Sequence, residues 1–330
     1  MKFAYAAAAA GILAIGLQAG PAGAQTKLKF AHVYEVNEPY HTWAVWAAGE
    51  IGRRTNKRYA MEVFPASALG NEPTINQGLA LGTVDIIYTG TAFAGNSYRP
   101  IAISNAPYIF RDFEHWRAYR DSALFGELAA GYESTTKHKI VALTYYGERH
   151  VTSNKAIMVP ADMRGLKLRV PQAPLYLMFA RSVGANATPI AFAEVYLALQ
   201  NKTVDAQENP LPTIQAKKFY EVQSNLALTA HITESLVTII GAPLWAKLSP
   251  ADRGAFESVF KQAAAVATDE IRAAELRLPA EFERLGKTVT RPDRAAFRQA
   301  ALPFHNDPQA GAGWTKQQYD RLQAIGARIN

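Results

Sequence analysis

The chain contains no cysteine. Disulfides, a thiol nucleophile, thiolate metal sites and a lipid-modified cysteine are therefore all excluded. After residue 24 the sequence also lacks any apolar run near the roughly 18 residues that a membrane-spanning helix needs. The 330 residues are enough for two domains of ordinary size.

Motifs of common enzyme classes are missing as well. The sequence contains no G-x-G-x-x-G, P-loop or G-x-S-x-G pattern. Its seven histidines form no H-E-x-x-H motif, and no two of them are spaced at i, i+4. We therefore expect no enzymatic activity, no cofactor and no dedicated metal site.

The net charge is moderately positive. The chain has 35 Lys and Arg and 28 Asp and Glu, which gives a net charge of +7, but the positive residues are scattered among acidic ones. Because no dense basic block is present, we expect no nucleic-acid partner. The excess charge is interpreted as a solvated surface with modest attraction for anions.

The first 24 residues have the pattern of a secretory signal peptide. Lys2 precedes an alanine-rich apolar run at 3–17, and residues 21–24 (Pro-Ala-Gly-Ala) fit a small-x-small cleavage site. The alternative is an uncleaved N-terminal anchor, but the run is short and has no stop-transfer flank. The predicted mature chain begins at Gln25 in the periplasm.

Hydrophobic patterning predicts alternating strands and helices. Such alternation is typical of α/β folds, here with a largely parallel sheet. The expected strands are 28–33, 58–64, 84–89, 139–145, 166–170 and 287–290, and the expected helices are 40–54, 74–81, 113–132, 175–183, 192–199, 213–220, 294–301 and 316–325.

One helix should be much longer than the others. Ser249 is a typical N-cap and Pro250 a typical first residue for a helix over 250–278. Pro279 is expected to bend or break this helix, and 281–285 to resume it.

Three polar residues are placed to bind an anion. Arg169 ends a predicted strand, where ligands of open α/β sheets gather, and its planar guanidinium can pair with a carboxylate through two parallel hydrogen bonds. Arg149 follows a predicted strand and a turn at Gly147, and Asn209 is expected in a loop before Pro210. Spacing alone leaves open that each arginine is a surface charge or a structural ion pair.

Several segments together resemble the substrate-binding subunits of TRAP (tripartite ATP-independent periplasmic) transporters. Two are highly specific in combination, namely Gly-Leu-Lys-Leu-Arg-Val-Pro at 165–171 and Asp-Ala-Gln-Glu-Asn-Pro at 205–210. Further similar segments are 64–70, 82–85, 107–112 and 217–223. The resemblance covers most of the mature chain and is nearest to the sialic-acid-binding branch around 149–231.

The resemblance implies a set of substrate-binding residues. It comprises Arg169, Arg149, Asn209, Phe192, Glu72 and His231, and we add Ala173 and Phe93 to the residues expected at the substrate. Arg169 would hold the substrate carboxylate in two bonds, assisted by Arg149 and Asn209. Phe192 would pack on the ligand, Glu72 matches a polar pocket position, and His231 matches a position near the pocket.

One stretch departs from the sialic-acid binders. They carry an acidic residue and an arginine where this chain reads Gly-Thr-Ala-Phe at 90–93. The departure argues against sialic acid as the ligand and leaves the expected carboxylate-binding residues Arg169, Arg149 and Asn209 in place. The aromatic residues Tyr34, Trp43, Tyr88 and Phe93 either line a more apolar cavity or belong to the core.

The resemblance also implies the architecture. The expected fold is α/β and periplasmic-binding-protein-like (type II), with two lobes around a ligand cleft and a long helix spanning both. We expect lobe I at 25–147 with about 235–275 returning to it, and lobe II at 148–234 with about 276–330 returning to it.

The implied function is delivery of a small organic carboxylate to small and large integral membrane subunits, driven by an ion gradient, by a monomeric protein. Two alternatives remain open from the residues. One is a ligand-binding sensor for an organic acid. The other is a periplasmic enzyme acting on organic acids, which would need a general base or a metal near Arg169, with His150 and His231 as the candidates.

Overall fold

The computed structural model describes residues 25–326, so the predicted signal peptide at 1–24 lies outside the described residues. The strands are β1 (Thr26–Ala31), β2 (Tyr59–Phe64), β3 (Ile86–Gly90), β4 (Lys139–Ser153), β5 (Lys167–Val170), β6 (Asn186–Pro189), β7 (Ala206–Pro210), β8 (Asn225–Ile240) and β9 (Thr288–Thr290). The α-helices are α1 (Pro39–Arg54), α2 (Glu72–Leu81), α3 (Thr91–Ala94), α4 (Phe113–Arg120), α5 (Ala123–Thr136), α6 (Leu177–Ser182), α7 (Val195–Gln200), α8 (Leu211–Ala216), α9 (Phe219–Val222), α10 (Ala242–Lys247), α11 (Pro250–Arg284), α12 (Arg294–Ala301) and α13 (Lys316–Ala324).

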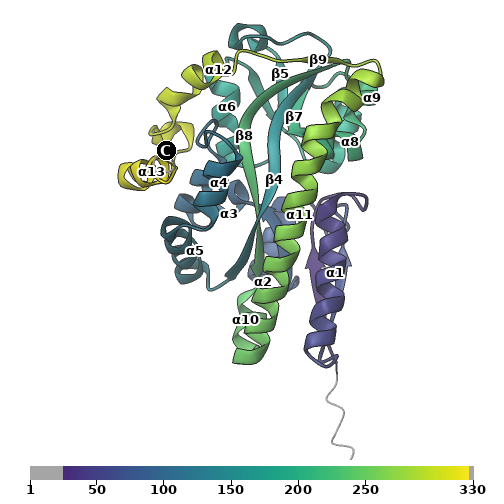
Figure 1. Cartoon of the computed structure of the whole chain (residues 1–330), viewed down its shortest axis with the longest axis vertical. Coiled ribbons are helices and arrows are strands. Elements are labelled where there is room, and N and C mark those ends of the chain that lie inside the picture. Colours follow the sequence, from purple (N-terminus) through teal and green to yellow (C-terminus); the bar gives the residue numbers. More distant parts are fainter. Residues whose placement is uncertain (1–24, 327–330) are drawn as a thin grey trace, which may run out of the picture.

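These strands form one sheet whose centre is a pair of long antiparallel strands. The order is β2-β1-β3-β8-β4-β7-β5-β6, with β9 beside β8. Strands β4 and β8 pair along nearly their whole length, from Lys139 opposite Ile240 to Ser153 opposite Asn225. At one end of this pair β3 lies beside β8, and at the other end β7 lies beside β4, both in antiparallel pairing. The two long strands therefore belong to both halves of the molecule (Figure 1).

The two halves are the α/β lobes that the fold class predicts. Lobe I contains β1, β2 and β3 with α1 and α2, and lobe II contains β5, β6 and β7 with α6 to α8 (Figure 1). Within each lobe the outer strands are parallel. The carboxyl ends of these strands face the junction between the two lobes. In open α/β sheets, ligands bind at the carboxyl ends of the strands.

Helix α11 runs along both lobes. Ser249 caps its first turn by accepting a hydrogen bond from the backbone N–H of Asp252 at 3.2 Å. Near this end Arg54 of α1 bonds Gln262 at 2.9 Å, and near the other end Gln215 of α8 bonds Glu281 at 3.1 Å. The expectation of a helix that spans both lobes is thus confirmed (Figure 1).

Of the two expected effects of Pro279, a bend or a break, the break is wrong, because α11 continues through this residue to Arg284. A proline inside a helix removes one backbone hydrogen bond and crowds the carbonyl four residues earlier. Leu278 and Phe282, on either side of Pro279, are both fully buried. Packing of this face outweighs the local cost of the proline.

Two local predictions near the junction are also wrong. The expected turn at Gly147 is a shift of register inside β4, which runs on through Arg149 to Ser153. Gly147 supplies the positive φ of 123° that this irregularity needs. Asn209 lies in strand β7 and not in a loop, paired with His150 of β4.

The sheet is mixed and not largely parallel. Strand β8, which the sequence analysis did not predict, is antiparallel to both β3 and β4. The stretch expected as one helix over 113–132 is divided into α4 and α5, because Ser122 begins a new helix by accepting a hydrogen bond from the N–H of Phe125. None of the helices within residues 25–326 combines the length and hydropathy needed to span a bilayer.

Candidate functional site

A small buried cavity lies between the lobes, where the long strands pass from one to the other. Its volume is about 20 Å³, close to the space of one water molecule. Eleven residues line it, namely Val33, Tyr34, Glu72, Tyr146, Arg149, Arg169, Pro171, Tyr176, Phe192, Asn209 and Glu234. They come from both lobes and from the two long strands.

Arg169 presents an unpaired donor at this cavity. It sits at the end of β5 and is only 2% exposed. Its Nε and Nη2 donate to the carbonyl of Ile190 at 3.0 and 2.6 Å. Its Nη1 has no partner and, within residues 25–326, is the only buried nitrogen of a charged side chain in that state. Burial and the nearby Arg149 lower the pKa of Arg169 to about 10, so it remains a cation at neutral pH.

Arg149, in contrast, is fully engaged by protein groups. Its guanidinium pairs with the carboxylates of Glu208 and Glu234. Its Nη2 also donates to Glu208 Oε1 at 2.7 Å and to the Glu208 carbonyl at 2.5 Å. Although burial alone would lower the pKa of Arg149, the two carboxylates outweigh it and raise that pKa.

His231 lies behind this ion pair and does not line the cavity. Its Nε2 is 3.0 Å from Glu208 Oε2, its Nδ1 is 2.8 Å from Thr229 Oγ1, and its ring stacks on Phe179 with centroids 3.7 Å apart. Burial lowers the pKa of His231, which therefore is neutral at neutral pH. It orients Glu208, which in turn orients Arg149.

Two further carboxylates border the cavity on the side of lobe I. Glu72, at the start of α2, accepts hydrogen bonds from the Gly90 N–H at 3.1 Å and from Thr89 Oγ1 at 3.3 Å. Burial raises its pKa to about 7. Glu234 of β8 accepts from Arg149 and from the Tyr176 hydroxyl, and burial raises its pKa as well.

Aromatic rings and an amide complete the walls. Phe192 lies on the lobe II side and faces Tyr34 of lobe I, with ring centroids 6.5 Å apart. The Arg149 guanidinium lies over the face of the Tyr176 ring, with its Cζ 5.2 Å from the ring centroid. The side-chain amide of Asn209 donates to Gln207 Oε1 at 2.6 Å. The cavity is thus cationic at Arg169, apolar at its sides and acidic toward Glu72 and Glu234.

The structure brings together five of the eight residues expected at the substrate. Arg169, Arg149, Asn209, Phe192 and Glu72 line the cavity. The other three, Ala173, Phe93 and His231, are buried close by but outside the lining. Among the aromatic residues that were left open, Tyr34 lines the cavity, whereas Trp43 and Tyr88 do not.

Sequence analysis missed Glu234, Tyr176 and Tyr146, which line the cavity too. Glu234 had a usable signal, because it is an acidic residue within the long β-branched and apolar stretch of β8. Acidic residues are rarely buried without a partner, so such a position indicates a functional or paired carboxylate. The two tyrosines carried no such signal.

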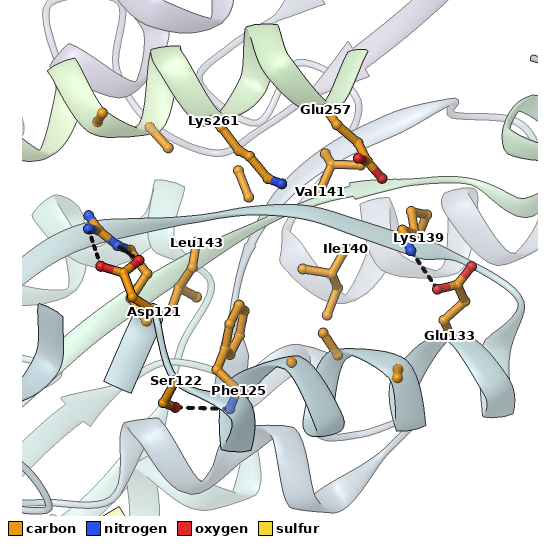
Figure 2. Close-up of a pocket in the computed structure, with 17 residues that line it drawn as sticks. Asp121, Ser122, Phe125, Glu133, Lys139, Ile140, Val141, Leu143, Glu257 and Lys261 are labelled. Carbon is orange, nitrogen blue, oxygen red and sulfur yellow. Dashed lines mark hydrogen bonds and ion pairs between the residues drawn. The ribbon is translucent and has the colours of Figure 1, made fainter. Parts of the chain in front are cut away.

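A larger groove of about 620 Å³ lies away from the junction, between α5, the start of β4 and α11 (Figure 2). Two of its charged residues, Arg120 and Lys139, are paired with Asp121 and Glu133. The groove has no buried unpaired charge like that of Arg169. No cluster of His, Asp or Glu side chains within residues 25–326 is arranged to hold a metal ion.

Comparison with known proteins gives a family match over almost the whole described chain. Residues 30–310 match the family model of bacterial extracellular solute-binding protein, family 7. The sialic acid-binding periplasmic protein SiaP of Vibrio cholerae serotype O1 is 35% identical over 297 residues, which cover 89% of this chain and 92% of that protein.

Two solved structures have the same fold over their whole length. A TRAP periplasmic solute-binding protein from Polaromonas sp. JS666, bound to D-erythronate, is 31% identical with a TM-score of 0.87, covering 92% of this chain and 100% of the other. One from Roseobacter denitrificans OCh 114, with bound L-galactonate, is 32% identical with a TM-score of 0.80, covering 91% and 98%.

Proposed function

The chain belongs to bacterial extracellular solute-binding protein family 7, the periplasmic binding proteins of TRAP transporters, and on this premise we propose that it captures a small organic carboxylate at Arg169. Proteins of this family bind small organic anions and work with membrane subunits that carry out uptake. The ligand carboxylate would lie at the junction of the lobes, with Arg149, Asn209, Phe192 and Glu72 around it.

One observation carries this proposal. Arg169 is buried with an unpaired Nη1, whereas Arg149 beside it is neutralised by two carboxylates. A buried unpaired charge is costly, and it is stabilised by an anion that accepts its hydrogen bonds. A carboxylate matches the guanidinium in charge and in geometry.

The size of the cavity implies that the lobes separate before the ligand enters. At about 20 Å³ the cavity is smaller than any organic acid. Contacts across the junction hold it closed, including Thr213 Oγ1 to Glu38 at 2.6 Å and Lys217 to Glu35 at 2.7 Å. The ligand favours a closed state only if it contacts both lobes better in that state than in the open one.

A thermal-shift screen over organic acids tests the proposal directly. Because a ligand that binds only the native state raises the apparent stability, we expect at least one small carboxylate to raise Tm in a concentration-dependent manner. The matching uncharged amide or alcohol should have little effect. No shift with any carboxylate in a panel of mono- and dicarboxylic, keto and sugar acids would contradict the proposal.

Replacing Asn209 with alanine should weaken binding without abolishing it. Its amide lies in β7 at the cavity, and loss of one hydrogen bond to a charged group costs about 1.5–3 kcal/mol. Calorimetry with the best acid from the screen measures the change. Gln207→Ala is the matched control, since Gln207 bonds the same amide but does not line the cavity. An equal loss in both variants would indicate that Asn209 acts only through the fold.

Four finer points belong to the same proposal. We propose that the protein acts as a monomer, serves a pair of small and large membrane subunits, and releases its ligand chemically unchanged. We also propose that the lobes divide near 147–148 and 234–235, which is supported by the irregular β4–β8 pairing between Tyr145 and Gly147. Recovery of a chemically altered ligand after prolonged incubation would favour an enzyme.

A further inference from the structure

Two carboxylates that line the cavity together with Arg169 approach the same glycine. Glu72 accepts a hydrogen bond from the N–H of Gly90 at 3.1 Å. A Cβ placed on Gly90 would lie 3.2 Å from Glu234 Oε1 and 3.1 Å from the Tyr176 hydroxyl. The absence of a side chain at residue 90 therefore lets Glu234 and Tyr176 close over this peptide. Glu72 and Glu234 form one acidic wall, which we call the acceptor wall.

The charges around the cavity limit how much negative charge a ligand can bring. Arg149 is already neutralised by Glu208 and Glu234, so among the cavity-lining residues that the structure describes Arg169 is the one cation with a free donor. It can compensate a single carboxylate. Burial already raises the pKa values of Glu72 and Glu234, so negative charge is costly at the acceptor wall. A second ligand carboxylate would add to that charge in a water-poor site, where it repels the ionised glutamates strongly. A hydroxyl group can instead donate a hydrogen bond to either glutamate.

We propose that Glu234, with Glu72, determines specificity at this site by selecting acids that carry one carboxylate and at least one hydroxyl group, and by rejecting dicarboxylates. This inference rests on the proposed function, because it requires Arg169 to hold the ligand carboxylate. It adds a residue, Glu234, whose strand β8 was not expected to contribute to binding.

A purely structural role for Glu234 as a partner of Arg149 does not account for its position. Glu208 already contacts Arg149 with both carboxylate oxygens and with its carbonyl. Glu208 is also supported by His231 and does not line the cavity. Glu234 adds a further contact to Arg149 and at the same time borders the cavity. The two glutamates can therefore be separated by experiment.

Calorimetry with four-carbon acids tests the inference. The acids are butyrate, 4-hydroxybutyrate, D-erythronate and succinate, all measured near neutral pH. We expect the wild-type protein to bind the better hydroxy acid at least about 10-fold more tightly than succinate. In Glu234→Gln, which keeps the shape but removes the charge, the preference for the hydroxy acid over succinate should fall by about 10-fold or more.

Glu208→Gln is the matched control, because it also removes a charge from Arg149 but lies outside the cavity lining. This variant should lower the affinity for all four acids to a similar extent and keep the order of their affinities. If it changes the preference as much as Glu234→Gln does, the effect passes through Arg149 and the inference is wrong. Glu72→Gln replaces Glu234→Gln if the latter does not fold, and it should shift the preference in the same direction.

The results separate failure of this inference from failure of the proposed function. Wild-type protein that binds succinate as tightly as the hydroxy acids overturns the inference but leaves carboxylate capture intact. Protein whose Tm responds to no carboxylate overturns the proposed function and the inference together. If the preferred acid has five or six carbons, the same comparison is made at that length with the hydroxy acid and the dicarboxylate.

Discussion

Replacing Arg169 with alanine is expected to lower the affinity for the carboxylate ligand by about 30-fold or more, which corresponds to a loss at the lower end of about 2–5 kcal/mol. The variant removes the buried donor that has no partner within residues 25–326. It also leaves the ligand carboxylate without a compensating charge inside the closed site. Isothermal titration calorimetry with the acid identified by thermal shift gives the affinity of both proteins.

The ligand-free variant should remain folded and no less stable. Within residues 25–326 the Arg169 side chain bonds the Ile190 carbonyl alone, and the substitution removes a buried cation that is costly to the fold because it lacks a full set of partners. Arg169→Lys is the matched variant. It keeps the charge but not the planar pair of donors, so its affinity should fall between those of alanine and wild type. An unchanged affinity in a folded Arg169→Ala protein would show that Arg169 does not bind the ligand carboxylate.

Replacing Arg149 with methionine is expected to have the largest effect on stability. The substitution leaves the buried carboxylates of Glu208 and Glu234 without their cation. Breaking one side of a buried ion pair typically costs about 3–5 kcal/mol in the free energy of unfolding. Chemical denaturation near neutral pH measures the loss.

The loss should shrink as the pH is lowered. Without Arg149 the folded protein holds two buried carboxyls whose pKa values lie above those in the unfolded chain. The folded state then binds more protons than the unfolded state, so its stability increases as the pH falls through those raised pKa values. Arg117→Met is the control, because Arg117 and its partner Glu114 are both about half exposed, at 56% and 58%, and little change is expected. A loss as small as that of the control would show that Arg149 is not a stabilising centre of the junction.

Local patterns in the sequence predicted much of the fold. The end of β5 at Arg169 and the N-cap of α11 at Ser249 were placed within a residue or two, since strand ends and helix caps depend on neighbouring residues. Strand β8 was missed because its polar residues Glu234 and His231 interrupt the apolar pattern. Those side chains are buried by pairing with Arg149 and Glu208, and such partners are not visible in a local window.

The site could be predicted only in part for a similar reason. The residues around Arg149 and Arg169 made both arginines suited to bind a carboxylate, and only the resemblance to a known family gave Arg169 the main role. The difference arises from residues far along the chain. Glu208 and Glu234 compensate Arg149, whereas in the described part of the chain Arg169 donates to a backbone carbonyl alone. Spacing shows which groups are available, and the three-dimensional arrangement decides which of them remains free.

The sharing of β4 and β8 by both lobes has a mechanical consequence. A protein whose two parts are joined by slack linkers can swivel freely, but here a continuous hydrogen-bonded ribbon crosses the junction with α11 beside it. Any separation of the lobes must bend and twist these strands, whose pairing is irregular at three places, between residues 140 and 142, 145 and 147, and 149 and 151. Paired strands of this kind resist bending and return elastically. Their stiffness therefore sets how far the two lobes separate in the ligand-free protein.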